Sequence, residues 1–146
     1  MSLTTAAAFS AAAAQTAADD FKYTDEQFAD IQMLRYRVEG FEKLTLKEKT
    51  FIYYLQEAAL QGRDILFDQN GRYNLRIRRL LEKVYTDYKG DRASADWQGF
   101  VTYLKRFWFS SGPHHHYGCE KFEPGFSEQW LRNALVDINY EEATCV

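Results

Sequence analysis

The sequence has little of what most disulfide frameworks, metal sites and phosphate sites need. It holds two cysteines, Cys119 and Cys145, which are too few for a disulfide framework. Its three histidines are consecutive, at positions 114–116, so no helical zinc motif with histidines one turn apart is present. It has no glycine-rich phosphate loop, and no stretch is long and apolar enough to span a membrane.

Charge and composition narrow the class of protein further. The 18 basic and 21 acidic residues leave a net charge of −3, which gives no overall field that favours nucleic acid. The apolar fraction is 46% and the aromatic fraction is 16%, which argues for a packed body and against disorder. With 146 residues, the chain is expected to form at most one domain.

The first twenty residues differ from the rest of the chain because they are rich in alanine. Ala12-Ala13-Ala14 before Gln15 fits a small-residue cleavage site, but no basic residue precedes Lys22. A signal-peptide remnant would place the protein in the periplasm or outside the cell, whereas a plain Ala-rich leader would leave it in the cytoplasm. We therefore divide the chain into a leader (1–20), a helical segment (21–140) and a divergent tail (141–146).

Hydrophobic periodicity predicts a mainly α fold with about five helices and one long loop rich in Gly, Pro and His. Thr45 with Glu48 forms a capping-box pattern, and Ser94 and Ser127 are candidate N-caps. A short extended piece is expected only around residues 121–122. The expected helices cover residues 24–38, 45–67, 73–89, 94–111 and 127–138, with residues 68–71 as the turn that ends the second.

Apolar stripes on these helices predict which faces are buried. The helix after Ser94 carries Trp97, Phe100, Leu104 and Phe107 at helical spacing, which is typical of a core-facing stripe. The helix after Thr45 has a similar periodic stripe, which includes Phe51, Ile52 and Leu55. If the chain is only part of a larger protein, we expect such stripes to lack partners and to expose apolar patches. The third helix has a basic face, which we expect to be solvated, with Glu82 paired to Arg78.

Most residue types that carry chemistry gather in residues 107–127. A metal site formed by His114, His116 and Cys119 is one interpretation, and a Cys119 thiolate activated by a histidine is another. A polar loop without either activity is favoured, because structural zinc sites usually need four well-spaced ligands. A calcium loop starting at Asp68 fails, since its twelfth position is Arg79 and not glutamate.

Two stretches resemble the dipeptidyl peptidase III family. The first runs from Leu44-Thr45-Leu46-Lys47-Glu48-Lys49 to Tyr53-Tyr54-Leu55-Gln56-Glu57-Ala58-Ala59 and is similar to an early helix of that family. The second runs from Phe109-Ser110-Ser111-Gly112 to Tyr117-Gly118-Cys119-Glu120-Lys121-Phe122-Glu123-Pro124 and resembles the loop that follows. Asp64 to Gly71 looks like the bacterial branch, and the resemblance covers roughly residues 21 to 138.

The resemblance implies a two-lobed zinc peptidase that removes dipeptides from the N-termini of short peptides. In that family, a helical His-Glu-x-x-(x)-His motif and a second glutamate hold the zinc, and the first motif supplies the general base. This chain has neither motif, so we expect no catalytic residues, no metal ligands and no activity from it alone. The family's peptide-contacting position corresponds to His116, Tyr117 and Gly118 here.

These observations lead to three hypotheses. In the first, the chain is the N-terminal part of such a peptidase and its partners are short peptides and the missing catalytic lobe. In the second, it is an autonomous helical module that binds a peptide or protein. In the third, it is a small protein that binds metal through its His/Cys loop. None of the three predicts binding to nucleic acid or to a membrane.

Overall fold

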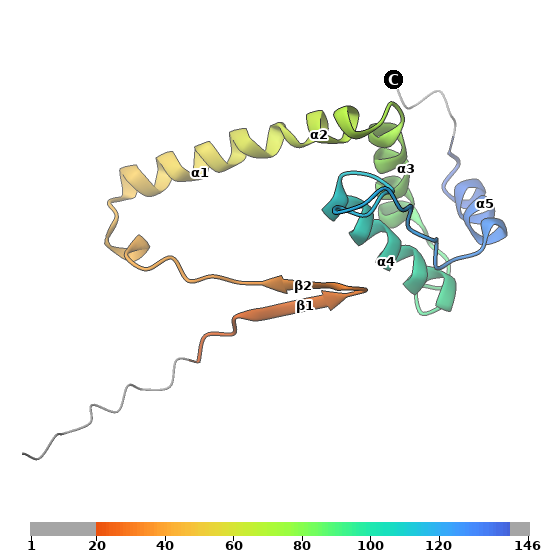
Figure 1. Cartoon of the computed structure of the whole chain (residues 1–146), viewed down its shortest axis with the longest axis horizontal. Coiled ribbons are helices and arrows are strands. Elements are labelled where there is room, and N and C mark those ends of the chain that lie inside the picture. The colour runs from red at the N-terminus through yellow and green to blue at the C-terminus, as the bar shows by residue number, and fades with distance from the viewer. Residues whose placement is uncertain (1–19, 141–146) are drawn as a thin grey trace, which may run out of the picture.

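A computed structural model describes residues 20–140 of the chain (Figure 1). Residues 1–19 of the predicted leader and the tail 141–146 with Cys145 lie outside the described residues. The fold is mainly α, as predicted, with one small two-stranded sheet. The elements are, in order, β1 (Thr24–Phe28), β2 (Ile31–Leu34), the 3-10 turn η1 (Phe41–Lys43), α1 (Leu46–Gln61), α2 (Arg63–Asn70), α3 (Asn74–Asp87), α4 (Ala95–Ser110) and α5 (Glu128–Asp137).

Three helices begin where their predicted N-caps stand. The Thr45 hydroxyl accepts from the Glu48 amide at 3.3 Å, and the Glu48 carboxylate accepts from the Thr45 amide at 2.8 Å. This reciprocal pair is the predicted capping box. Ser94 and Ser127 cap α4 and α5 through the hydroxyl alone, which in each case accepts a hydrogen bond from the backbone amide three residues later.

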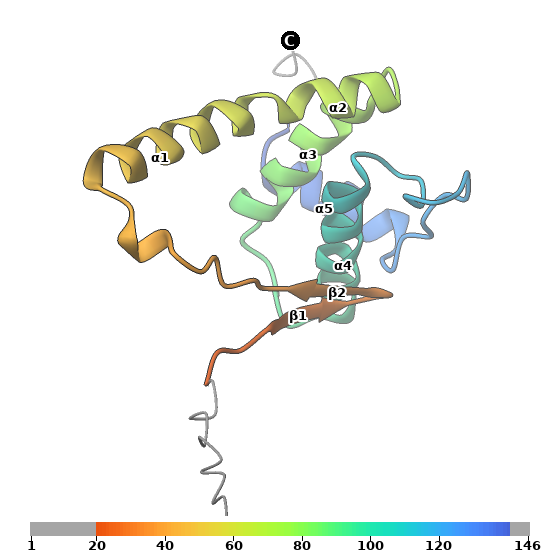
Figure 2. The same cartoon turned by 60° about the vertical axis from the view of Figure 1, so that its left-hand side comes forward.

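The predicted helix over residues 24–38 is wrong, because this segment forms the β1–β2 hairpin. The strands pair antiparallel with Phe28 opposite Ile31, which leaves Ala29 and Asp30 as a two-residue turn. Ala29 adopts a φ of 50°, a conformation that a helix does not contain. The hairpin lies against α4, and the Lys105 ammonium pairs with the Glu26 carboxylate (Figure 2).

Helices α1 and α2 follow one another as a nearly continuous rod (Figure 1). They separate at Gly62, which keeps a helical backbone with φ −74°. Helix α1 has no buried residue, and Phe51, Ile52 and Leu55 are all exposed, so its apolar stripe has no partner among the described residues. The α2 end of the rod joins the core, where Phe67 is buried against Phe107 of α4.

The core lies between α3, α4 and α5, and the predicted α4 stripe forms its centre. Phe100, Leu104 and Phe107 are fully buried, and Trp97 is 5% exposed. Leu81 and Val84 of α3 cover one side of this stripe and α5 covers another. An aromatic cluster closes the α5 side; it contains Tyr88, Trp97, Phe100, Phe126 and Trp130.

The basic face of α3 is occupied by ion pairs, as expected for a solvated face. Arg78 binds Glu82 at 2.7 Å and Asp64 of α2 at 2.6 Å, so it joins the two helices. Lys83 pairs with Asp87 at 2.7 Å. The predicted Arg78–Glu82 pair is therefore confirmed. The Asp64 carboxylate is a second acceptor for the Arg78 guanidinium.

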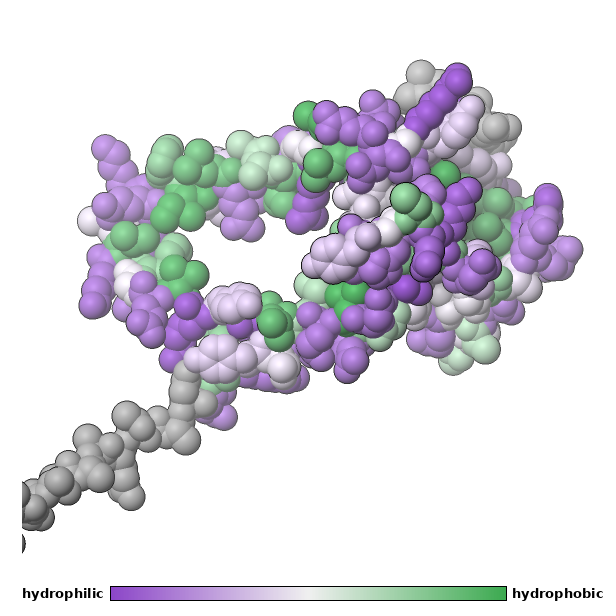
Figure 3. All heavy atoms as spheres, viewed as in Figure 1, coloured by the Kyte–Doolittle hydropathy of each residue, from purple (hydrophilic) through white to green (hydrophobic). Residues whose placement is uncertain are grey.

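An opening runs through the molecule between the α1–α2 rod and the hairpin (Figure 3). Apolar residues of α1 and of the segment between β2 and α1 lie along its border in that view. Among the described residues, no helix combines the length and the apolar character that a membrane span requires.

Candidate functional site

The loop between α4 and α5 starts with a tight helix end. Ser111 takes the left-handed conformation with φ 53°, and the Gly112 amide donates to the Phe107 carbonyl at 3.1 Å. Pro113 follows and has no amide hydrogen to continue the helix. This confirms that Gly112-Pro113 stops the helix and directs the loop away from the α4 axis.

Backbone hydrogen bonds give the loop a fixed base. The Phe122 amide donates to the Pro113 carbonyl at 2.8 Å, and the His115 amide donates to the Glu120 carbonyl at 2.8 Å. His114 and Lys121 thus face each other as an isolated antiparallel bridge, which agrees with the extended piece predicted at residues 121–122. The four residues 116–119 form the tip that this base holds out.

His115 connects the loop to the hairpin. Its Nδ1 accepts a hydrogen bond from the Tyr117 amide at 3.2 Å, so its Nε2 carries the hydrogen in the neutral ring. Nε2 lies 3.3 Å from the Asp30 carboxylate, which also pairs with Arg106 of α4 at 3.2 Å. Asp30 at the hairpin turn is therefore bound by the loop and by α4 together.

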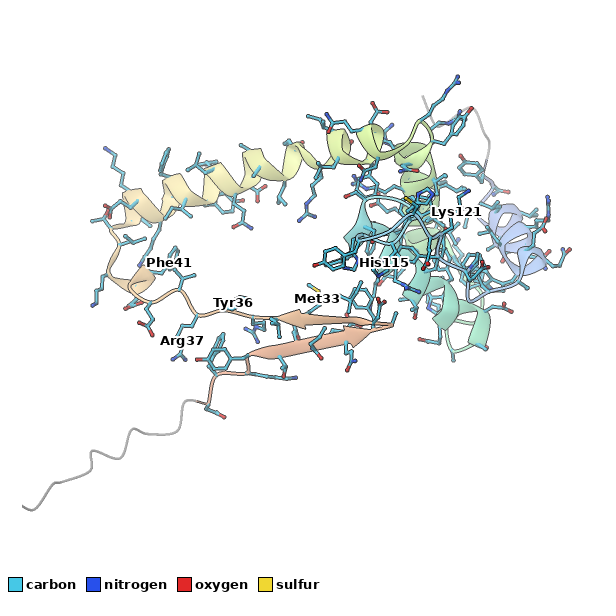
Figure 4. The ribbon with its side chains drawn as sticks, viewed as in Figure 1. Met33, Tyr36, Arg37, Phe41, His115 and Lys121 are labelled. Carbon is cyan, nitrogen blue, oxygen red and sulfur yellow. The ribbon has the colours of Figure 1, made fainter. Side chains whose placement is uncertain are left out.

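A buried aromatic ring, that of Phe122, packs beside the contact between the loop, the hairpin turn and α4. Phe122 is 7% exposed, and the Arg106 guanidinium lies 4.2 Å from the centre of its ring. The flat guanidinium group of Arg106 therefore contacts the Phe122 ring, and one of its N–H groups binds the Asp30 carboxylate. Figure 4 shows His115 and Lys121 in the loop beside α4, with the hairpin next to them.

The pKa of Asp30 is lowered, which makes the hairpin junction sensitive to acid. Its own backbone hydrogen bond is the largest cause, followed by the hydrogen bond with His115 and the charge of Arg106. The largest cause is local to the hairpin turn, and only the parts due to His115 and Arg106 stabilise the docked hairpin, at pH values above the unfolded pKa of about 3.9. That contribution is lost as the pH falls through the lower folded pKa.

Asp30→Asn should reproduce this acid effect at neutral pH. The neutral amide cannot form an ion pair with the Arg106 guanidinium. We therefore expect NMR contacts between the hairpin and α4 to weaken while the α3–α5 core stays folded. Asp25→Asn is the matched control, because the Asp25 carbonyl, and not its carboxylate, is engaged by Gln32. Equal loss of contacts in both variants would contradict the role given to Asp30.

The tip carries the three residues expected to contact peptide: His116, Tyr117 and Gly118. The His116 ring lies between Tyr117, at 4.2 Å, and Phe109 of α4, at 4.9 Å between ring centres. Tyr117 is 89% exposed, and a Cβ added at Gly118 would come no closer to its surroundings than 4.0 Å, at the Glu120 amide. The tip thus presents an open aromatic face beside accessible backbone, on a base that other contacts fix.

The two alternative chemistries of the loop gain no geometric support. Within residues 20–140, no group of three or more His, Cys, Asp or Glu side chains is placed to hold a metal ion. Cys119 is a free, exposed thiol, and no hydrogen bond joins it to a histidine in the described part of the chain. His115 already uses both ring nitrogens with Tyr117 and Asp30.

The residues that hold the loop were not identified from the sequence. Asp30 and Arg106 lie 85 and 9 positions before His115, and neither belongs to a recognisable motif. Asn74, buried at the start of α3, also went unnoticed; its side-chain amide donates to the Ser111 carbonyl at 3.4 Å. Only the unusual burial of an asparagine, which is visible in the structure alone, marks that position.

A comparison of the sequence with protein-family models gives no match, and a comparison with curated proteins also gives none. The resemblance to dipeptidyl peptidase III therefore rests on residues 44–59, 64–71 and 109–124 alone.

Proposed function

We propose that this chain is the N-terminal part of a zinc-dependent dipeptidyl peptidase and forms one wall of its peptide cleft. His116, Tyr117 and Gly118 contact the peptide in this proposal. The zinc, its ligands and the general base belong to a second lobe that this chain does not supply. The observation that carries the proposal is the exposed tip on its fixed base, at the position where the family resemblance places a peptide contact.

The chemistry of the tip supports peptide binding. A flat aromatic face at Tyr117 offers apolar contact to a peptide side chain at low cost in side-chain entropy. Gly118 leaves the adjoining backbone open, so a peptide main chain can approach it closely. The bonds of His115 to the tip and to the hairpin keep this surface in one arrangement before any peptide arrives.

The exposure of α1 supports a larger body around this chain. Tyr53, Tyr54 and Leu55 lie in one run and cover more than half of the helix circumference, yet each is more than half exposed. A wide apolar stripe on a helix normally packs against another part of the protein. A further protein layer against α1 would remove this surface from water, and the second lobe of a peptidase is the cover that we propose.

The residues described here do not fit a zinc ion. Zinc would supply an activated water for peptide hydrolysis, but no cluster of ligands is present among residues 20–140. In this proposal, the chain itself positions peptide and excludes water from one side of the cleft. Hydrolysis is not expected from the isolated chain, even with zinc added.

An autonomous peptide-binding module is the second candidate. It is favoured by the α3–α5 core, which is complete without α1 and includes fully buried Val84, Phe100 and Leu104. Both candidates use the same tip for the peptide. They differ in what covers α1, and the module requires no zinc lobe.

Peptide binding at the tip is tested by Tyr117→Ala. The substitution removes an aromatic side chain that makes few contacts in the free chain, so the melting temperature should stay unchanged. Affinity for short unstructured peptides, measured by calorimetry, should fall about tenfold, as expected for losing one aromatic anchor.

Tyr53→Ala on α1 is the matched control, since it also removes an exposed tyrosine. Tyr117→Phe should retain most of the affinity, because the aromatic face remains. If Tyr117→Ala binds peptides as tightly as the unchanged chain, the tip is not the peptide-contacting surface. Release of a dipeptidyl chromophore by the isolated chain would overturn the proposal that the zinc and the general base lie on a second lobe.

A further inference from the structure

A small polar pocket lies beneath the loop, where α2 ends, α3 begins and α4 ends. Its volume is about 200 Å³, below the range of pockets for drug-sized molecules. Such a volume admits a single terminal group with its adjoining carbon atoms. The lining residues are Asn70, Asn74, Ser110, Ser111, Gly112, His114, His115 and His116.

The pocket is rich in hydrogen-bond donors. Asn74 is only 6% exposed, and its amide nitrogen and that of Asn70 both lie 3.4 Å from the Ser111 carbonyl. Two amide groups thus share one acceptor, which leaves donor capacity on each of them. The Ser110 hydroxyl is buried without a hydrogen-bond partner in the described part of the chain. A buried unpartnered hydroxyl is costly, so an added acceptor would be favourable.

The electrostatic surroundings favour a negative group in this pocket. None of its lining residues is acidic. Helix α3 begins there at Asn74, without a side-chain cap and without an acidic residue in its first turn. No acidic side chain in that first turn neutralises the partial positive charge of this helix end, although the C-terminal ends of α2 and α4 at the same pocket carry partial negative charge. Within residues 20–140, no hydrogen bond uses the ring nitrogens of His114 or His116, whereas both nitrogens of His115 are engaged.

We propose that this pocket binds the terminal carboxylate of a short peptide whose main chain lies along the Tyr117-Gly118 tip. His116 lines the pocket and its ring also contacts that of Tyr117, so the two surfaces adjoin. In this arrangement the carboxylate oxygens accept hydrogen bonds from the Ser110 hydroxyl, the two asparagine amides and the ring N–H groups of His114 and His116. This inference rests on the proposed peptide contact at the tip and adds which end of the peptide lies there.

The test is an NMR titration of the 146-residue chain with three probes: tetra-alanine with a free carboxylate, the same peptide with an amidated C-terminus, and acetate alone. The free acid should shift the side-chain amides of Asn70 and Asn74 and the ring signals of His114. The amidated peptide should bind about tenfold more weakly, because hydrogen bonds to a charged group are lost. Ser110→Ala should weaken the free acid by a similar factor.

Thr102→Ala is the matched control, since it removes a hydroxyl from the same helix about 12 Å along its axis. Ser110→Ala removes an unpartnered group, so the folded state is expected to persist in both variants. Equal affinity for the free and amidated peptides, or shifts confined to the tip, would overturn the proposal while leaving the peptide contact at Tyr117 intact. Acetate binding as tightly as tetra-alanine would show a small-anion pocket and would also overturn it. Absence of binding by every probe would count against both the pocket and the tip.

Discussion

Replacing Gly99 with alanine is expected to destabilise the folded chain by about 3 kcal/mol or more, as severe overpacking does. Gly99 lies inside α4, where alanine would ordinarily stabilise a helix by about 1 kcal/mol. Here the added Cβ would lie 1.9 Å from the Gly125 carbonyl oxygen, and the obstacle is backbone, which cannot rotate away. The clash therefore outweighs the gain in helix propensity.

The consequence of this clash reaches the α4–α5 junction. The segment at Gly125 leads into α5, and the Asp96 carboxylate accepts from the Ser127 amide at 2.8 Å close by. Separating Gly99 from Gly125 would pull this hydrogen bond and the nearby aromatic cluster apart. The loss is measured by chemical denaturation followed through tryptophan fluorescence, because Trp97 and Trp130 both lie in that cluster.

Gly62→Ala is the control for Gly99→Ala. Gly62 has a helical backbone and an added Cβ would only make ordinary contact, at 3.4 Å from the Ala59 carbonyl oxygen. This variant should be neutral or stabilised by up to about 1 kcal/mol. Equal stability of the Gly99→Ala and Gly62→Ala variants would contradict the close packing of α4 on the segment before α5.

Phe100→Ala should lower the free energy of unfolding by about 3–5 kcal/mol, the usual cost of removing a buried phenylalanine. Phe100 is fully buried and contacts the rings of Trp97, Phe126 and Trp130. Its removal would leave a cavity among side chains from α4, α5 and the segment before α5. A shift of the urea midpoint at unchanged slope is the expected signature.

Leu55→Ala on α1 is the matched comparison. Leu55 is 53% exposed in a helix without buried residues, so its truncation should change stability by less than about 0.5 kcal/mol. A large loss at Leu55 would mean that α1 is packed against something in solution. Such a result would contradict the open rod described here, and it would identify α1 as part of an interface in the isolated chain.

Local signals in the sequence predicted where helices start and which face of α4 is buried. The hydroxyls of Thr45, Ser94 and Ser127 satisfy amides within three residues, so nothing distant decides whether these caps form. The α4 stripe has large apolar residues on one side only, and a partner surface for it exists within the described chain. Both features depend on short-range order and are readable without knowledge of the fold.

The hairpin could not be predicted because its stabilising contacts are distant. Phe28, Ile31 and Leu34 recur at a spacing that also fits one helix face, and this spacing produced the wrong assignment. Asp30 is held by Arg106 and His115, which follow it by 76 and 85 positions. These tertiary contacts favour two strands and a turn over the local helical preference.

The exposure of the α1 stripe has a different origin. Its residues have the spacing of a core-facing helix, but the described chain offers no surface to cover them. A periodic pattern predicts that a face is buried somewhere, and it does not say by which protein layer. The resemblance located His116, Tyr117 and Gly118 together, while the residues that fix the loop beneath them came only from the structure.

The most direct test of the two-lobed account is the coding DNA beyond the codon for Val146, read in every frame and then expressed as one product. The account predicts a helix with a His-Glu-x-x-(x)-His motif and a second glutamate motif, together with zinc-dependent release of a dipeptidyl chromophore. Tyr117→Ala should reduce that release by raising KM. A downstream sequence without such a helix in any frame would contradict the account and would favour an autonomous peptide-binding module.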